Sequence, residues 1–164
     1  MNQPVKYIDL HQIIKKKLHS SKKKTEKQSL NVTSMDFPQE DANNFYIGCE
    51  DGVIYKAQIH SNEGGSASRN VKQSYIGHQG PITSLSFHPQ QSQISPLISG
   101  LMLSSSFDWF LKLWNPKVTN QCLKTFDYAE DYIYDVQWNP IHPTLFASGD
   151  GEGTIDFWDL SADF

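Results

Sequence analysis

The sequence is poor in cysteine, with only Cys49 and Cys122 among 164 residues, and these form neither a CxxC pair nor a disulfide framework. This scarcity fits a reducing compartment and argues against a small disulfide-stapled domain. No apolar run approaches the length of a membrane span. Helical periodicity is nearly absent and is confined to the short, weakly amphipathic segment 10–18. These absences predict a cytosolic protein built from strands, with no membrane partner.

Motifs of catalysis and cofactor binding are also missing. There is no Gly-x-Gly-x-x-Gly or Walker loop to hold a nucleotide, and no Gly-x-Ser-x-Gly turn to present a nucleophile. His88, His142, Cys49 and Cys122 do not have the spacing of metal ligands. The sequence therefore predicts neither a cofactor nor a metal site, and favours a protein that is not an enzyme.

Positive charge is scarce outside the N-terminal segment. The first 30 residues hold eight lysines against Asp9 and Glu26, whereas the rest of the chain carries a formal charge of −10. A lysine run can bind an anionic partner such as nucleic acid, a membrane or an acidic protein. This run lacks the interleaved aromatics that stack on bases, so we favour a solvated connection between strands and expect no nucleic-acid partner.

What the sequence does contain is a spacing that occurs twice. Five residues recur in order: Ile82, Phe87 and Pro89 return 51 positions later as Ile133, Trp138 and Pro140, and Leu111 and Trp114 return 44 positions later as Ile155 and Trp158. The difference places a seven-residue insertion in the segment 90–100. A weaker copy runs from Val32 to Ala57, with alanine in place of the tryptophan. This period, opening at Gly77-His78 and closing at Trp114-Asn115, is typical of a WD repeat, one four-stranded blade of a β-propeller.

The repeat predicts the fold and its divisions. We expect an all-β chain with strands near 5–10, 31–37, 44–49, 53–59, 71–76, 81–87, 101–106, 110–115, 121–126, 132–138, 145–149 and 154–159. We expect about three and a half four-stranded blades of a longer ring, cut inside a blade at both ends. The expected divisions are the end of a preceding blade (1–10), a lysine-rich connection (11–29), and three blades (30–76, 77–126 and 127–164), the last without its fourth strand.

Four residues of the middle repeat have the types of a catalytic triad with a tryptophan: His78, Ser106, Asp108 and Trp114. In WD repeats these types form a structural chain of hydrogen bonds from indole to hydroxyl to imidazole to carboxylate. No oxyanion loop accompanies them, so we favour the structural tetrad over catalysis. We expect the tetrad to be incomplete in the other two repeats. Ala129, Asp150 and Glu152 replace histidine, serine and aspartate in the last repeat, and Cys49 replaces serine in the first.

Large aromatics at loop positions are candidates for partner binding. Trp109 follows Asp108 in a turn that usually carries a small polar residue, and Tyr132 lies at the entry to a first strand on the same face. Exposed aromatics of this kind are typical binding anchors. The alternative is that Trp109 folds over its own blade as a lid. Phe107 is a further candidate, although we expect it to pack inward.

Several longer strings together resemble the propeller of the cytoplasmic dynein intermediate chain family. They are Gly77-His78-Gln79-Gly80-Pro81-Ile82-Thr83, Ser105-Ser106-Phe107-Asp108-Trp109, Lys112-Leu113-Trp114, Gly48-Cys49-Glu50-Asp51-Gly52, and the run from Asp131 to Pro143. The resemblance covers about 32–160 and is closer to the cytoplasmic than to the axonemal members. The insertion in 90–100 and the lysine run depart from the animal pattern.

The resemblance implies a non-catalytic subunit that is cytoplasmic and associated with microtubules. In that family the propeller docks on the tail of the dynein heavy chain, and an extended N-terminal region, which we expect to lie outside this chain, binds light chains and dynactin. The alternative is a generic WD-repeat adaptor outside motor complexes.

Overall fold

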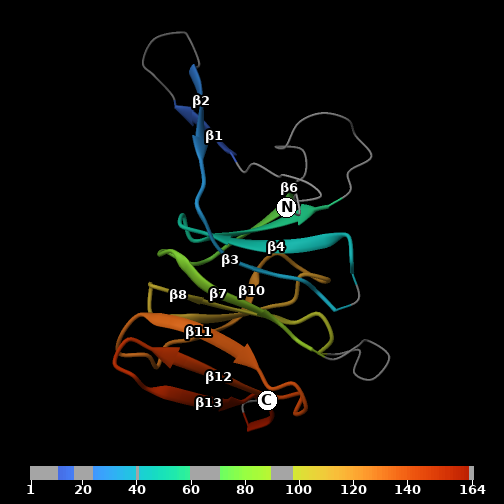
Figure 1. The fold of residues 1–164 in the computed structure, drawn as a ribbon, viewed down its shortest axis with the longest axis vertical. Helices are drawn as coiled ribbons and strands as arrows, with labels where there is room; N and C mark the ends of the chain where they lie inside the picture. Colours follow the sequence, from blue (N-terminus) through green and yellow to red (C-terminus); the bar gives the residue numbers. More distant parts are fainter. Residues whose placement is uncertain (1–10, 17–23, 40, 60–70, 90–97, 163–164) are drawn as a thin grey trace, which may run out of the picture.

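The computed structural model describes residues 11–16, 24–39, 41–59, 71–89 and 98–162, and these residues are all-β, as the sequence predicts (Figure 1). The first sheet contains β3 (Val32–Asp36), β4 (Asn44–Cys49), β5 (Val53–Gln58) and β6 (Val71–Ile76). The second contains β7 (Ile82–Phe87), β8 (Met102–Ser106), β9 (Leu111–Trp114) and β10 (Cys122–Phe126). The third contains β11 (Ile133–Trp138), β12 (Leu145–Asp150) and β13 (Ile155–Asp159), followed by the 3-10 turn η2 (Leu160–Ala162).

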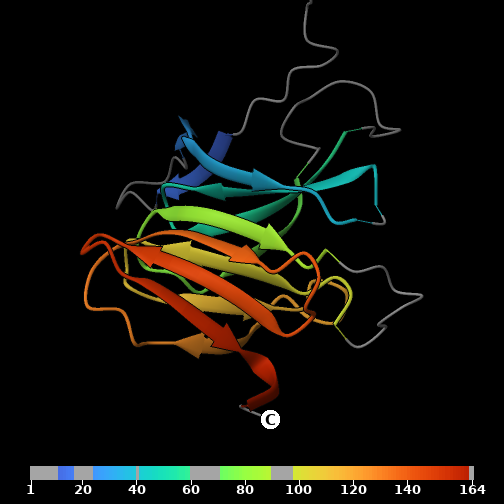
Figure 2. The same ribbon diagram turned by 60° about the horizontal axis from the view of Figure 1, so that its bottom comes forward.

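Each sheet is an antiparallel meander in sequence order, and the three sheets stack face to face (Figures 1 and 2). The first strands β3, β7 and β11 lie side by side at one margin of the stack. Hydrogen bonds join them across the sheets: the backbone N–H of Phe87 donates to Asp36 Oδ2 at 2.6 Å, and the indole of Trp138 donates to the carbonyl of Ser86 at 3.0 Å. This arrangement is that of a partial propeller.

Two apolar layers fill the spaces between the sheets. The layer between the first and second sheets includes Tyr46, Ile82 and Trp114, and the layer between the second and third includes Leu113 and Trp138. β7 is buried along nearly its whole length because a sheet covers each of its faces. β3 and β11 alternate between exposed and covered positions, since each has a described neighbour on one side only.

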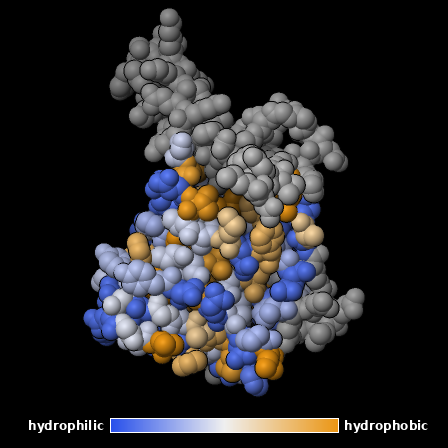
Figure 3. Space-filling model, viewed as in Figure 1, coloured by the Kyte–Doolittle hydropathy of each residue, from blue (hydrophilic) through white to orange (hydrophobic). Residues whose placement is uncertain are grey.

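The third sheet leaves apolar side chains on its outer face. Ile155 is 66% exposed and Phe157 is 84% exposed, although both lie within β13. Apolar surface is visible at this end of the molecule in Figure 3. A sheet that buries only one face is typical of a terminal unit in a stack, because each unit covers its apolar surface against the next.

The segment 11–29 contains structure that the sequence reading did not predict. β1 (His11–Lys16) and β2 (Lys24–Ser29) pair as an antiparallel hairpin beyond the first sheet (Figure 1). The strand expected near 5–10 lies outside the described residues. The remaining predicted strands are confirmed, each within about two residues of its expected bounds.

Candidate functional site

A buried chain of hydrogen bonds lies in the second sheet. The indole Nε1–H of Trp114 donates to Ser104 Oγ at 2.9 Å, and that hydroxyl lies 2.7 Å from His78 Nε2. His78 Nδ1 is 2.9 Å from Asp108 Oδ2. Since Ser104 Oγ accepts from the indole, its own proton is directed to Nε2, and Nδ1–H then donates to the carboxylate. The chain ties the loop before β7 to the turn between β8 and β9.

The serine of this chain is Ser104 and not Ser106, so the sequence-based tetrad is wrong at that position. Met102 lies directly opposite Trp114 across the strands, and Ser104 is the next residue on the same face. An indole reaches such a diagonal neighbour, whereas Ser106 lies two residues further on, at the turn. Ser106 instead donates to the carbonyl of Gly80 at 3.0 Å and accepts from the backbone N–H of Asp108 at 3.1 Å.

The same pairing corrects the expected replacements in the other sheets. Trp158 Nε1 donates to Ser148 Oγ at 2.9 Å, so the third sheet keeps its serine, and Asp150 is not its replacement. Asp150 Oδ1 accepts from the backbone N–H groups of Glu152 and Thr154 and closes the turn. In the first sheet the equivalent position, two residues after the partner of Ala57, is Ile47 rather than Cys49.

Burial controls the protonation of the chain. Desolvation lowers the pKa of His78 more than the Asp108 carboxylate raises it, so the imidazole is neutral. Burial alone would raise the pKa of Asp108, but hydrogen bonds from His78 and from the backbone of Gln79 and Phe110 bring it below its usual value. The pair is therefore a neutral donor on a carboxylate acceptor.

This constellation has no access to a substrate. His78 is buried, and Ser104 and Trp114 have no exposed surface. A nucleophile must face a pocket, and the hydroxyl of Ser104 is instead enclosed by the indole and the imidazole. Gly77 shows how closely the parts fit, since an added Cβ there would lie 2.8 Å from the Trp114 ring. The chain stabilises the fold.

An aromatic cluster is exposed at the edge of the stack formed by the β8–β9 and β12–β13 turns and by the entries to β7 and β11; we call this the turn edge. The cluster consists of Phe107, Trp109, Tyr132 and Tyr134, which we call the aromatic loop surface. The Phe107 ring lies 5.0 Å from Tyr132 and 5.5 Å from Tyr134, and Trp109 lies 6.4 Å from Tyr132, between ring centroids. All four side chains are exposed, including 47% of Trp109 and 46% of Tyr132.

The structure thus brings together the three aromatics singled out from the sequence. Trp109 contacts Tyr132 of the neighbouring sheet and does not close over its own sheet as a lid. Phe107 does not pack inward as expected, because its ring lies between the two tyrosines of the third sheet. Contacts across two sheets make this surface a property of the assembled stack.

Trp109 has an unusual backbone, with φ at +71°, in the region that favours glycine. The corresponding turn residues of the other two sheets are Gly52, with φ at +77°, and Gly153, with φ at +85°. The turn therefore requires a left-handed residue in every sheet, and only the middle sheet meets this with a tryptophan. A bulky residue there costs free energy that glycine would not.

Tyr134 was missed in the sequence. The pairing of β11 with β12 passes from Ile133–Asp150 to Asp135–Gly149, so Tyr134 is the extra residue of a β-bulge. Thr83 and Thr33 occupy the same bulge position in the other sheets. Bulges redirect side chains, and here the bulge turns an aromatic toward Phe107. The signal that could have found it is the departure from threonine at this point of the repeat.

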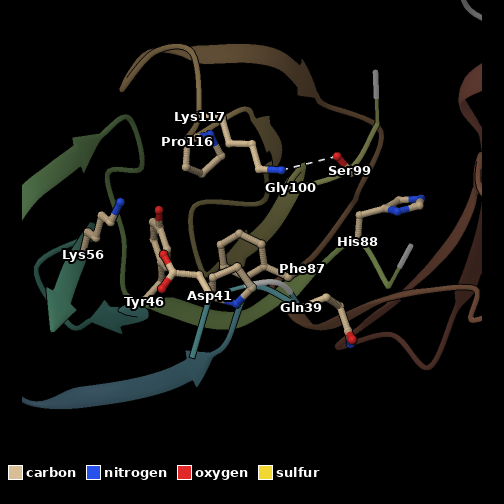
Figure 4. A pocket seen from close by; sticks show the side chains of 11 residues that line it. Gln39, Asp41, Tyr46, Lys56, Phe87, His88, Ser99, Gly100, Pro116 and Lys117 are labelled. Carbon is tan, nitrogen blue, oxygen red and sulfur yellow. Dashed lines mark hydrogen bonds between the residues drawn. The ribbon is translucent and has the colours of Figure 1, made fainter. Parts of the chain in front are cut away.

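A pocket lies at the opposite edge, between the first and second sheets (Figure 4). Tyr46 and Phe87 line it together with Lys56 and Lys117, and Lys117 Nζ donates to Ser99 Oγ at 3.4 Å. Asp41, the acidic residue of the pocket, accepts hydrogen bonds from the backbone N–H groups of Asn43, just before β4, and Asn44, the first residue of β4, both at 3.1 Å. Asp41 and Lys117 are thus engaged in holding loops, and Lys56 lies over the Tyr46 ring, so the lining residues show no paired nucleophile and base.

Searches for two other kinds of site give negative results within the described ranges. Among those residues, no group of three or more His, Cys, Asp or Glu side chains is placed to hold a metal ion. No helix of the part that the structure describes is both long and apolar enough to cross a membrane.

Comparison with known proteins identifies the family. The family model for the PAC11 dynein intermediate chain matches residues 12–149. The chain is 42% identical over 136 residues to the cytoplasmic dynein 1 intermediate chain of Drosophila melanogaster, covering 83% of this chain and 19% of that protein. It is 25% identical over 143 residues to the human dynein axonemal intermediate chain 2, covering 87% of this chain and 22% of that protein. The chain thus spans about a fifth of the length of these relatives. It belongs to the dynein intermediate chain family.

Proposed function

We propose that this chain is part of a non-catalytic scaffold subunit of cytoplasmic dynein, and that its propeller binds the tail of the dynein heavy chain. Identity is higher to the cytoplasmic relative, at 42%, than to the axonemal one, at 25%. The only triad-like constellation in the described residues is buried and structural. Both observations support a scaffold in microtubule-based transport, with the motor activity in another chain.

The main support for this docking site comes from comparing the four positions of the aromatic loop surface with the equivalent positions in the other two sheets. Each of its four positions holds a small or polar residue in the other two sheets, as the strand pairing aligns them. The correspondences are Phe107 with Glu50 and Gly151, Trp109 with Gly52 and Gly153, Tyr132 with Asn31 and Pro81, and Tyr134 with Thr33 and Thr83. The blade does not need an aromatic at these places, so we assign the cluster to a partner.

Energetics favour the same assignment. Four contiguous exposed aromatics are costly in water, and Trp and Tyr dominate binding hot spots, where truncation often costs 2 kcal/mol or more. Trp109 also accepts an unfavourable backbone conformation. Trp109 is therefore unfavourable to the free protein through both its exposed ring and its backbone conformation. A contact made in the complex explains this most simply. In this proposal light chains and dynactin bind elsewhere in the full-length protein.

The test compares Trp109→Gly with the wild type in the full-length intermediate chain, co-expressed with the heavy-chain tail. Glycine suits the backbone of this turn, so the variant removes the ring without straining the fold. We expect binding to weaken at least about tenfold while the melting temperature stays near that of the wild type. Ile141→Ala, an exposed residue at the opposite edge, is the control. No association of the wild type with the tail would favour an adaptor outside motor complexes.

A further inference from the structure

Carboxylates border the aromatic loop surface. Asp131 precedes Tyr132 and accepts the backbone N–H of that residue at 2.7 Å. Its carboxylate lies against the β12–β13 turn beside Tyr134: a Cβ added to Gly151 would overlap Asp131 Oδ2 and lie 3.2 Å from the Tyr134 ring. Glu130 and Glu152 are exposed on either side, one before Asp131 and the other after Gly151. Acidic groups and aromatic rings therefore share one surface.

The distribution of charge along the stack is uneven. Eight carboxylates lie at the turn edge, namely Glu50, Asp51, Asp108, Asp127, Glu130, Asp131, Asp150 and Glu152. Of the lysines with described side chains, Lys56 and Lys117 line the pocket at the opposite edge (Figure 4). Lys112 is buried, and its Nζ donates to Thr125 Oγ1 at 3.0 Å. None of these three lysines lies beside the aromatic loop surface, and Lys124, the fourth with a described side chain, places its Nζ 5.2 Å from the centre of the Phe126 ring.

We propose that the segment seated on the aromatic loop surface is cationic and presents arginine to it; this inference rests on the proposed docking function. A guanidinium stacks on the faces of Trp and Tyr rings and pairs with carboxylates in a bidentate geometry. Trp109 and Tyr132 supply the rings, and Asp131 and Glu152 supply the carboxylates. A purely apolar partner would leave these carboxylates desolvated without a counter-charge, which is unfavourable.

The charges of the surface also have a kinetic consequence. A negative edge attracts a positive segment before contact, and such steering weakens as salt shortens the screening length from about 30 Å at 0.01 M to about 8 Å at 0.15 M. Association with the heavy-chain tail should therefore slow as salt rises. Dissociation should depend less on salt, because the aromatic contacts are not screened.

The experiment reverses the charge of the surface in the full-length intermediate chain and measures its affinity for the heavy-chain tail. Asp131→Lys with Glu152→Lys should weaken binding at least about tenfold and reduce its salt dependence. Asn120→Lys with Gln121→Lys adds positive charge in the turn at the opposite edge and should change affinity by less than about twofold. If the double variant fails to fold, Glu152→Lys alone decides, since its side chain makes no described hydrogen bond.

The outcomes separate this inference from the proposal beneath it. Weakening by the charge reversals together with weakening by Trp109→Gly supports both. Weakening by Trp109→Gly alone, with charge reversal neutral or favourable, overturns the cationic partner and leaves the docking surface. Equal effects of the reversal at the two edges would show a non-specific charge effect and also overturn the inference. Undiminished binding of Trp109→Gly overturns both.

Discussion

At the scale of single residues, Ser104 is the centre of the buried chain because it serves two partners at once. Its oxygen accepts from Trp114 and its proton goes to His78. Residues 104–106 are all serine, so residue type cannot show which of them joins the tetrad. The pairing of β8 with β9 decides it, since it sets Ser104 diagonal to Trp114. Sequence reasoning predicted three of four tetrad members and missed the one that depends on register.

A double-mutant cycle tests this assignment. Ser104→Ala leaves the indole N–H of Trp114 and Nε2 of His78 without a partner, so it should lower the free energy of unfolding by about 1–3 kcal/mol. Combined with Trp114→Phe, it should show a coupling energy above about 0.5 kcal/mol, whereas Ser106→Ala with Trp114→Phe should be additive. Chemical denaturation of the full-length protein measures both. Coupling at Ser106 and additivity at Ser104 would restore the original tetrad.

The pKa shifts at His78 and Asp108 predict how stability depends on pH. Both pKa values are lowered in the folded protein, so in each case the unfolded chain binds the proton more readily. The contribution of His78 is present above its unfolded pKa, about 6.5, and is lost as pH falls below it; that of Asp108 is lost on acidification below about 3.8. Melting temperature should therefore fall from pH 7 to pH 5. A rise over that interval would indicate a charged, paired His78.

Substitution of Trp109 gives a separate prediction, which concerns only the melting temperature. Replacing it with glycine relieves a left-handed backbone, worth about 1 kcal/mol or somewhat more. It also removes the edge-on contact with Tyr132, worth about 0.5–1.5 kcal/mol. The two effects nearly cancel, so the melting temperature should change little. Trp109→Ala retains the backbone strain and should be less stable than Trp109→Gly; the reverse order would mean that the turn relaxes on substitution.

At the scale of elements, strand positions were predictable because their causes are local. Alternation and turn residues such as Asp51-Gly52 fix where strands begin and end, and the observed bounds follow them. The β1–β2 hairpin was missed since its lysine-rich strands lack apolar alternation. The aromatic loop surface was found only in part, because it joins two sheets and its fourth member, Tyr134, owes its direction to a bulge.

The turns between second and third strands differ in what holds them. In the β8–β9 turn Asp108 accepts from His78 and from the backbone of Gln79 and Phe110. In the β12–β13 turn Asp150 has the corresponding backbone role, and Glu152 projects outward. Asp108→Ala should therefore cost about 2–4 kcal/mol, while Glu152→Ala should stay within about 0.5 kcal/mol. Thermal and urea unfolding measure the difference, and similar losses at both positions would contradict these roles.

At the scale of the whole molecule, the stack is held by contacts between neighbouring sheets. β7 is buried from both sides, whereas the third sheet leaves Ile155 and Phe157 exposed. On the opposite end, Val32 and Met35 of β3 are also exposed. Burying a side chain of this size gains about 1.5–3 kcal/mol, so both ends favour association with a further apolar face.

Residues 1–164 expressed alone should for this reason self-associate at micromolar concentration. The outer face of β13 and its edge are both available to another copy, and an apolar edge strand is a ready template for pairing. Sedimentation velocity over a range of concentrations measures the association. Phe157→Lys with Ile155→Lys should reduce it, because charge on that face opposes stacking, whereas Val118→Lys, at an exposed apolar residue in the β9–β10 turn, should have little effect. A monodisperse monomer that unfolds cooperatively at all concentrations would show that the chain is stable without a further blade, and the apolar face of β13 would then need another explanation.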